Sequence, residues 1–428
     1  MTKGDDAMAN ARKPRAFQIV IAVAVLLAAA GAGVSVAVLR HGVSPARPES
    51  ASNTRKHKTK TIPSLALVSA TPGANAASVA FHEKITLVFN SPIAEDSTLP
   101  SLSPAVPGTW SRPAPNTLEF DPQAQFFPLE EVTVEVPGGA KGVRAVDGGL
   151  LSADLTWHFT VEDAPTLRLQ QLLAELGYLP VAFAPSSTVA QSTNGGESAP
   201  DPSSGRSMAS ALAAEPTVPD AISLSPLPGS FAWRYSAMPP QLSTLWAPGN
   251  FDVVTEGAVM AFEADHGLAL SGVADATVWR SLLDAVAQRV ATTRPYTWVV
   301  ITESDPETLY VWRGGHVVYQ SLANTGISVA PTETGTWPVY LRYTSVTMSG
   351  YNPDGSYYSD PGVPWVAYFH GGDAVHGFWR SAFGFAQSLG CVELPITNAA
   401  IVYPYDTYGT LVTVTTGNLS AELGTTPS

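Results

Sequence analysis

The sequence is short of cysteine and of basic residues, and each shortage excludes a class of protein. Cys391 is the only cysteine among the 428 residues, so the chain forms no internal disulfide and this residue can act only as a thiol. Lys and Arg number 23, against 36 Asp and Glu. Ten of these basic residues but only three of the acids fall among the first 60 positions, which leaves a formal charge of −20 on the rest of the chain. This excess of acid argues against nucleic acid as a partner.

Metal-binding motifs are also missing. There is no HExxH run, no pair of CxxC motifs and no zinc-like spacing of His, Asp and Glu, so we expect no metal and no other cofactor. What the chain does have is a hydrophobic content of 45%, ample for packed cores. Its length predicts about two to four domains.

One long apolar run stands near the N-terminus, at residues 17–39. A helix of this length spans the hydrocarbon core of a bilayer, which is about 30 Å thick. We interpret the run as an uncleaved transmembrane anchor that leaves the basic tail, 1–16, in the cytoplasm and the rest of the chain outside it. A cleaved signal peptide with a processing site at 35–37 is the alternative. Residues 40–62 are rich in Ser, Pro and Lys and are expected to form a linker.

Residues 63–163 carry a strand pattern. Short alternating runs rich in β-branched and aromatic residues are separated by turn residues, and they lie at 84–89, 117–120, 132–136 and 155–160. The segment resembles a bacterial Ig-like β-sandwich. It holds no cluster of acids and histidines, so we expect a spacer or interaction module.

Residues 164–290 are expected to be mainly helical. Four leucines share one face of a helix that ends at Gly177, namely Leu169, Leu172, Leu173 and Leu176. A second helix is expected near 255–263, and a third carries Trp279. The intervening stretch, about 181–245, is rich in Ser, Pro and Ala, and we expect disorder or an extended loop there. The helices resemble a small three-helix peptidoglycan-binding domain, and the resemblance implies binding to glycan strands.

The residues that carry chemistry lie near the C-terminus. Cys391 follows Gly390 directly and stands fifteen positions after His376. A thiol is a good nucleophile only as the thiolate, and a nearby imidazole is the usual means of producing one. A glycine before the cysteine lets backbone N–H groups face a substrate oxygen. The pattern therefore indicates acyl transfer by a cysteine nucleophile.

These surroundings resemble the catalytic domain of L,D-transpeptidases of the YkuD type, whose signature is a His-Gly or His-Ser followed by Ser-His-Gly-Cys. The similar segments are 376–384 and 388–393, with further similarity at 324–326, 331–337, 363–369 and 409–414. Two positions depart from the family. Leu389 stands where a His is usual, and Glu393 stands where Arg or Asn is usual.

The resemblance implies a role for each motif residue. Cys391 would be the nucleophile and His376 the base, with the imidazole oriented by the backbone carbonyl of Gly377. The N–H groups of Leu389, Gly390 and Cys391 would stabilise the oxyanion. The Ser388 hydroxyl would orient the turn.

The resemblance also implies a β-rich catalytic domain over 295–416, a tail at 417–428 and peptidoglycan as the substrate. The cysteine would form a thioester on a tetrapeptide stem, release the terminal D-alanine and pass the acyl group to an amine on a neighbouring stem. Carbapenems would be covalent inhibitors, and the domain would work on the cell-wall side of the membrane.

Candidate substrate contacts are less sharply indicated. They are His370, Trp379, Arg380, Glu393 and Tyr351. From charge alone, Arg380 would hold a stem carboxylate and Glu393 the acceptor ammonium. Turn residues throughout 351–363 predict a loop that forms a substrate lid.

Three alternatives accompany this interpretation. A sortase-like transpeptidase is disfavoured by the spacing of His376 and Cys391 and by the glycine before the cysteine. An L,D-carboxypeptidase would use the same site with water as the acceptor. A catalytically weak scaffold that binds peptidoglycan is supported only by Leu389 and Glu393. The expected fold is a mainly β multidomain chain with one transmembrane helix, an Ig-like sandwich, a small helical domain and a β-rich catalytic domain.

Overall fold

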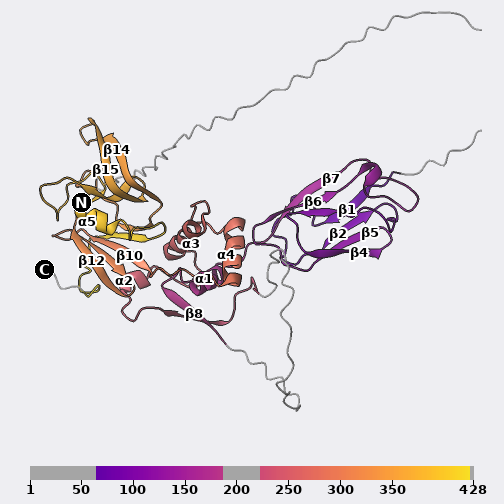
Figure 1. Ribbon diagram of the computed structural model, residues 1–428, viewed down its shortest axis with the longest axis horizontal. Coiled ribbons are helices and arrows are strands. Elements are labelled where there is room, and N and C mark those ends of the chain that lie inside the picture. The colour runs from indigo at the N-terminus through magenta and orange to yellow at the C-terminus, as the bar shows by residue number, and fades with distance from the viewer. Residues whose placement is uncertain (1–63, 187–221, 425–428) are drawn as a thin grey trace, which may run out of the picture. The chain divides into compact units, whose positions relative to one another are not determined.

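The computed structural model describes residues 64–186 and 222–424, and strands outnumber helices among these residues (Figure 1). The expected basic tail, anchor and linker lie outside the described residues, as does the centre of the Ser/Pro/Ala-rich stretch. Within the residues that are described, no helix combines the length and the apolar character needed to cross a membrane.

The first domain consists of two antiparallel sheets, with strand orders β1-β2-β5-β4 and β3-β6-β7. The strands are β1 (Leu67–Thr71), β2 (Ile85–Phe89), β3 (Ser101–Ser103), β4 (Gly108–Ala114), β5 (Thr117–Pro122), β6 (Glu131–Val136) and β7 (Leu155–Thr160). In β2, buried Ile85, Leu87 and Phe89 alternate with half-buried residues, because one face of the strand meets the core. The four strands expected from the sequence in this region are confirmed.

Helices follow the first domain. They are α1 (Thr166–Glu175), α2 (Pro240–Ser243), α3 (Val253–His266) and α4 (Ala276–Gln288). The Asp252 carboxylate accepts a hydrogen bond from the Thr255 N–H at 2.9 Å and so caps α3. The leucine face expected for α1 is buried, and α1, α3 and α4 contribute to one core. These contacts confirm the three expected helices.

The expectation of disorder or loop over 181–245 is wrong at both described ends of that stretch. β8 (Val181–Pro185) pairs antiparallel with β9 (Gly229–Trp233), and α2 follows. Aromatic rings hold this hairpin, since Phe231 contacts Phe183 at 5.0 Å and Trp246 at 5.0 Å between ring centroids. The Ser-, Pro- and Ala-rich composition of the stretch suggested disorder, although these few aromatic contacts order its two ends.

The last domain is built on two sheets with one helix, α5 (Ile396–Val402). One sheet has the order β12-β11-β10-β18-β13 and the other the order β14-β15-β16-β17. The strands are β10 (Thr297–Thr302), β11 (Thr308–Arg313), β12 (His316–Leu322), β13 (Gly335–Pro338), β14 (Leu341–Tyr351), β15 (Tyr357–His370), β16 (Asp373–Phe378), β17 (Val392–Pro395) and β18 (Leu411–Thr415). Side chains from both sheets, among them Val299, Val412, Phe369 and Val375, share one core. This core fixes the second sheet, which carries the residues of the candidate site.

The segment expected to be a lid is a β-hairpin and not a loop. Tyr351 ends β14, and residues from Tyr357 onward belong to β15, so only the few residues between them form the turn. Asp354 makes that turn by accepting hydrogen bonds from the N–H and hydroxyl of Ser356. The remaining turn-forming residues are accommodated by a register shift between Val346 and Met348.

Candidate active site

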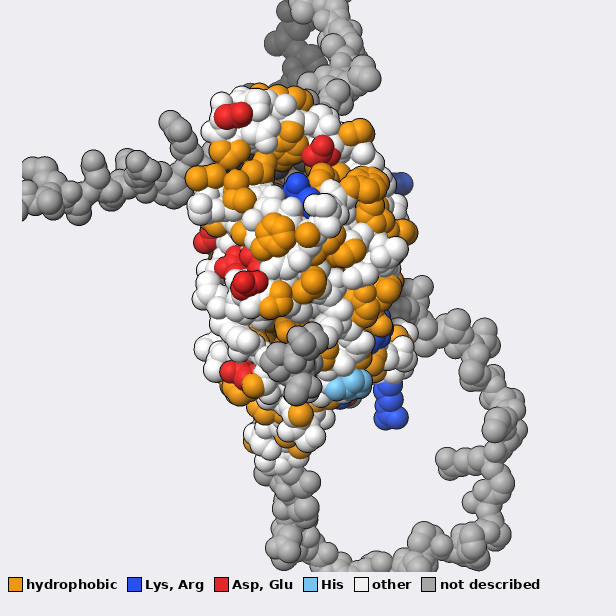
Figure 2. All heavy atoms as spheres, turned by 90° about the vertical axis from the view of Figure 1, so that its left-hand side faces the viewer, with side chains coloured by type: hydrophobic (Ala, Val, Ile, Leu, Met, Phe, Trp, Pro, Cys, Tyr) orange, Lys and Arg blue, Asp and Glu red, His pale blue; other side chains and the backbone are white. Residues whose placement is uncertain are grey.

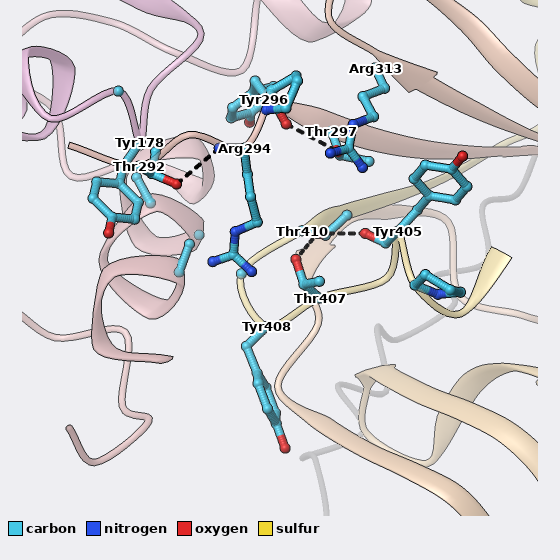
Figure 3. A pocket seen from close by; sticks show the side chains of 17 residues that line it. Tyr178, Thr292, Arg294, Tyr296, Thr297, Arg313, Tyr405, Thr407, Tyr408 and Thr410 are labelled. Carbon is cyan, nitrogen blue, oxygen red and sulfur yellow. Dashed lines mark hydrogen bonds between the residues drawn. The ribbon is translucent and has the colours of Figure 1, made fainter. Parts of the chain in front are cut away.

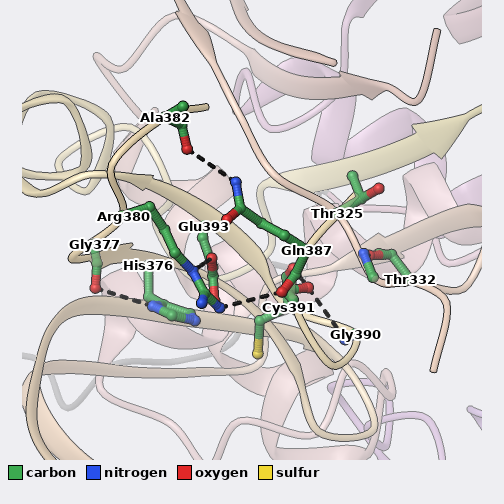
Figure 4. A network of polar contacts seen from close by, with 12 residues as sticks. Thr325, Thr332, His376, Gly377, Arg380, Ala382, Gln387, Gly390, Cys391 and Glu393 are labelled. Carbon is green, nitrogen blue, oxygen red and sulfur yellow. Dashed lines mark hydrogen bonds and ion pairs between the residues drawn. The ribbon is translucent and has the colours of Figure 1, made fainter. Parts of the chain in front are cut away.

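Two neighbouring strands bring the cysteine and the histidine together. β16 and β17 are parallel, and His376 lies opposite Glu393 in their register. Side chains alternate between the two faces of a strand, so His376 and Glu393 project from the same face. Cys391 comes directly before β17 and packs in one cluster with Ala374 and Phe378, which alternate onto the same face of β16 as His376. Figure 4 shows His376 and Cys391 among the polar residues of this region, with the imidazole bonded to Gly377.

The imidazole of His376 is held in one tautomer. Its Nδ1 lies 3.1 Å from the carbonyl oxygen of Gly377, which can only accept a hydrogen bond. Nδ1 therefore carries the proton, and Nε2 of the neutral ring is a proton acceptor. His376 is only 2% exposed, and this burial lowers its pKa below the usual value. The ring is thus neutral at pH 7 and able to act as a base.

The thiol of Cys391 is packed beneath the β14–β15 hairpin. The residue keeps part of its surface accessible, but it packs against a cluster that includes Met348, Val366 and Tyr368. Burial raises the pKa of the thiol to about 12, while a hydrogen bond from the backbone of Ala374 acts in the opposite direction. The resting cysteine is therefore protonated.

The turn before the cysteine is closed by Ser388. Its hydroxyl donates to the Cys391 carbonyl at 2.5 Å and accepts from the Gly390 N–H at 3.2 Å. Gly390 has φ +120°, and a Cβ at this position would lie 2.5 Å from Oδ1 of Asp373, so only glycine fits. The Gly390 N–H is thus engaged within the turn. Among the residues described, no acceptor is found for the N–H groups of Leu389 and Cys391, which can serve as oxyanion donors.

A second segment supports this turn. The Thr325 carbonyl accepts from the N–H groups of Gln387 and Ser388, at 2.9 Å each. Thr325 is itself held by Glu307, whose carboxylate accepts from the Thr325 N–H at 2.6 Å and from its hydroxyl at 2.8 Å. Burial raises the pKa of Glu307. Sequence reasoning missed Glu307, because a single acid between two strand patterns carries no distinguishing signal.

Arg380 and Glu393 form a bidentate ion pair. Nε and Nη2 of Arg380 donate to the two carboxylate oxygens of Glu393 at 2.7 Å each, and Nη2 also lies 3.3 Å from the Gln387 carbonyl (Figure 4). The Glu393 side chain is 6% exposed. Separate roles for these residues, one on a stem carboxylate and one on an ammonium, were expected from charge. The structure joins them, so each charge is neutralised by the other in this state.

The remaining expected substrate contacts are dispersed. Nδ1 of His370 lies 3.9 Å from Oδ2 of Asp373, and the His370 ring packs on Trp337. Asp373 is the residue that lies against Gly390. Trp379 is 65% exposed and adjoins Arg380 at a surface hollow. Tyr351 is 73% exposed at the hairpin tip, where its ring contacts Tyr357. The structure thus brings His370 and Trp379 to the borders of the site, whereas no described contact joins Tyr351 to the cysteine.

The accessible surface of this domain is more apolar than charged. Leu389, at the position where the family usually has His, is 38% exposed. Figure 2 looks onto the left-hand side of Figure 1 and shows hydrophobic side chains over much of that face with few charged ones between them. Within the described residues, no group of three or more His, Cys, Asp and Glu side chains is arranged to hold a metal ion.

Comparisons with known families agree with two of the domains. Residues 296–414 match the L,D-transpeptidase catalytic domain, and residues 60–161 match the bacterial Ig-like domain. Neither match includes the helices α1 to α4, so the peptidoglycan-binding assignment stays a prediction. A comparison with curated proteins finds no match.

Similar solved structures include three L,D-transpeptidases. L,D-transpeptidase 3 from Mycobacterium tuberculosis, in complex with a faropenem-derived adduct, is 12% identical over 82% of this chain and 98% of its own, with a TM-score of 0.26. The enzyme from Mycobacterium smegmatis is 12% identical over 82% of this chain and 99% of its own, with a TM-score of 0.24. The catalytic domain of the E. faecium enzyme is 22% identical over 29% of this chain and 99% of its own, with a TM-score of 0.26. These values are too low to carry an argument about substrate.

Proposed function

We propose that this chain, whose residues 296–414 match the L,D-transpeptidase catalytic domain, cross-links peptidoglycan through a cysteine acyl-enzyme. The observation that carries the proposal is the parallel pairing of β16, which holds His376, with β17, which begins directly after Cys391. The bond from Nδ1 to the Gly377 carbonyl supports it further, because Nε2 is then the atom that accepts a proton.

Acylation would begin from a neutral thiol and a neutral imidazole. As the sulfur of Cys391 bonds to the carbonyl carbon of the stem peptide, its proton passes to Nε2 of His376. The oxyanion that forms is stabilised by the N–H groups of Leu389 and Cys391. The carbon–nitrogen bond then breaks, the imidazolium returns the proton to the departing D-alanine, and a thioester remains.

Deacylation would follow the same path in reverse order. A side-chain amine of a neighbouring stem attacks the thioester carbon and loses a proton to His376. The carbon–sulfur bond breaks, and the sulfur takes the proton back as a thiol. With water in place of the amine, the product would be a shortened stem and the activity that of an L,D-carboxypeptidase.

The proposal extends to the location of the enzyme. The apolar run at 17–39 would anchor the chain in the cell membrane as a single span, with the catalytic domain on the cell-wall side. The helices α1, α3 and α4 would hold glycan strands near the site. Both statements rest on the sequence.

The first test is intact-mass spectrometry of the purified chain after reaction with imipenem. In the second, the chain is incubated with a disaccharide-tetrapeptide substrate and the products are analysed. We expect one covalent adduct on the wild type and none on Cys391→Ala. Leu389→His, which restores the usual family residue, serves as a matched variant that keeps the adduct. Cross-linked dimers support the transpeptidase, and tripeptide alone supports the carboxypeptidase. A folded protein that yields no adduct and no product supports the scaffold and overturns the proposal.

A further inference from the structure

A cleft with a volume of about 130 Å³ lies where the helices meet the catalytic domain (Figure 3). Its walls come from the turn after α1, from α3, from the end of β11 and from the segments 292–297 and 404–410. Neither His376 nor Cys391 lines it, so it is distinct from the candidate active site.

The walls of the cleft are packed firmly together. A Cβ on Gly257 of α3 would lie 2.6 Å from the Gly409 carbonyl oxygen, and a Cβ on Gly409 would lie 2.1 Å from the Gly257 carbonyl oxygen. Only glycine allows the two backbones to approach so closely. Trp298 and Trp312 of the catalytic domain also belong to the same core as α3. The cleft is therefore a formed feature of this contact.

The charge of the cleft is opposite to that of the chain. Arg294 and Arg313 line it and no Asp or Glu does, although the chain carries a formal charge of −13. Arg294 is paired with Asp265 outside the lining. Among the described residues, Arg313 has no carboxylate or carbonyl partner, and its guanidinium lies over the ring of Tyr405 at 5.3 Å from the centroid. A half-buried guanidinium without an acceptor favours an anionic ligand.

The size and lining of the cleft restrict that ligand further. A closed cavity of about 150 Å³ accepts one benzene ring, so this cleft of about 130 Å³ has room for a carboxylate and the few atoms next to it, with the rest of a ligand extending into solvent. Tyrosine rings and threonine hydroxyls complete its lining. Figure 3 shows Arg294 reaching between the helix and the segment that carries Thr407 and Tyr408. The planar guanidinium suits a carboxylate, which it can bind with two parallel hydrogen bonds.

We propose that this cleft binds a small carboxylate ligand, with the carboxylate on Arg313 and the body of the ligand against the tyrosines. An acidic sugar and the carboxyl terminus of a peptide share this chemistry. The site goes beyond the proposed function, because binding here requires no reaction at Cys391.

The experiment is isothermal titration of the full chain carrying Cys391→Ala, so that turnover contributes no heat. The probes are N-acetylmuramic acid, D-alanyl-D-alanine and the neutral N-acetylglucosamine. We expect one of the two carboxylates to bind with a stoichiometry of one and the neutral sugar not to bind. The carboxylate that binds identifies the source of the ligand.

Variants locate the binding. Arg313→Gln should weaken carboxylate binding about tenfold or more. Arg313→Lys should weaken it less, because lysine keeps the positive charge but cannot donate two parallel hydrogen bonds to the carboxylate. Arg289→Gln, at an exposed arginine of the helical region that does not line the cleft, is the matched control and should bind normally. Equal binding of the neutral sugar, no binding of either carboxylate, or unchanged binding in a folded Arg313→Gln variant overturns the proposal. These outcomes are independent of adduct formation at Cys391, so the two proposals can fail separately.

Discussion

At pH 7 the thiol of Cys391 should react with iodoacetamide about 10²-fold more slowly than the same thiol in the unfolded chain. Burial raises the pKa of Cys391 to about 12. At pH 7 such a thiol is ionised to about one part in 10⁵, against about 3% for an unperturbed cysteine. A thiolate of higher pKa is also more nucleophilic, which recovers a factor of about 40 and leaves the net difference of about 10².

The assay is unusually clean, because Cys391 is the only cysteine of the chain and a single mass increment reports its alkylation. Rates are measured from pH 6 to pH 10 on the folded protein and on the same protein in urea. We expect the folded rate to rise with pH over the whole range. A plateau between pH 6 and pH 8, at or above the unfolded rate, would mean a thiolate–imidazolium pair and would refute this reasoning.

A charge variant tests the cause of the shift. The neighbouring carboxylate of Asp373 raises the pKa of Cys391 in addition to burial. Asp373→Asn removes that charge, so it should lower the pKa and speed alkylation at every pH below the midpoint. An unchanged profile would indicate that Asp373 has no influence on the sulfur.

The remaining predictions concern stability and the turn. Arg380→Gln leaves the buried Glu393 without its partner and should lower the free energy of unfolding by about 3 kcal/mol, whereas Glu393→Gln should cost about 1 kcal/mol, since the freed arginine can reach water. Urea unfolding of both variants and of the double variant measures their coupling, and a coupling near zero would contradict the pairing. Gly390→Ala should abolish the carbapenem adduct in a folded protein, because the added Cβ meets Asp373; an undiminished adduct in the mass spectrum would show that the turn tolerates it. Burial raises the pKa of Asp406 to about 7, so the folded state keeps a proton that the unfolded chain releases above pH ~4. Stability should therefore fall between pH 4 and pH 7 and level off above, and urea unfolding of Asp406→Asn should show a smaller fall; an equal fall would assign it to another group.

Local patterns explain which parts of the fold could be predicted. The alternation in β2 and the leucine face of α1 depend only on neighbours in sequence, and both were read correctly. The spacing of His376 and Cys391 marked one residue on β16 and one that directly precedes the neighbouring strand β17. Each of these signals repeats within a few residues, so no knowledge of tertiary contacts was needed.

Long-range contacts explain what was missed. The β8–β9 strand pair joins segments about 50 residues apart, with a Ser/Pro/Ala-rich stretch between them. No local sequence pattern predicts this pairing. Turn residues at 351–363 suggested a loop, but strand pairing extends through most of that range. In both cases hydrogen bonds and packing between distant strands outweighed the local preference.

The sequence by itself determined which groups are available for the proposed chemistry, because the single thiol, the preceding glycine and the upstream histidine are identities that no fold can change. Tertiary structure alone decided the charges around that thiol. It paired Arg380 with Glu393, placed Glu307 beside Thr325 and, among the residues that the structure describes, left Arg313 without an acceptor at a distant cleft. The physical reason is that the energy of a charge depends on its distance from other charges and on its burial, and both are set only when distant segments pack together.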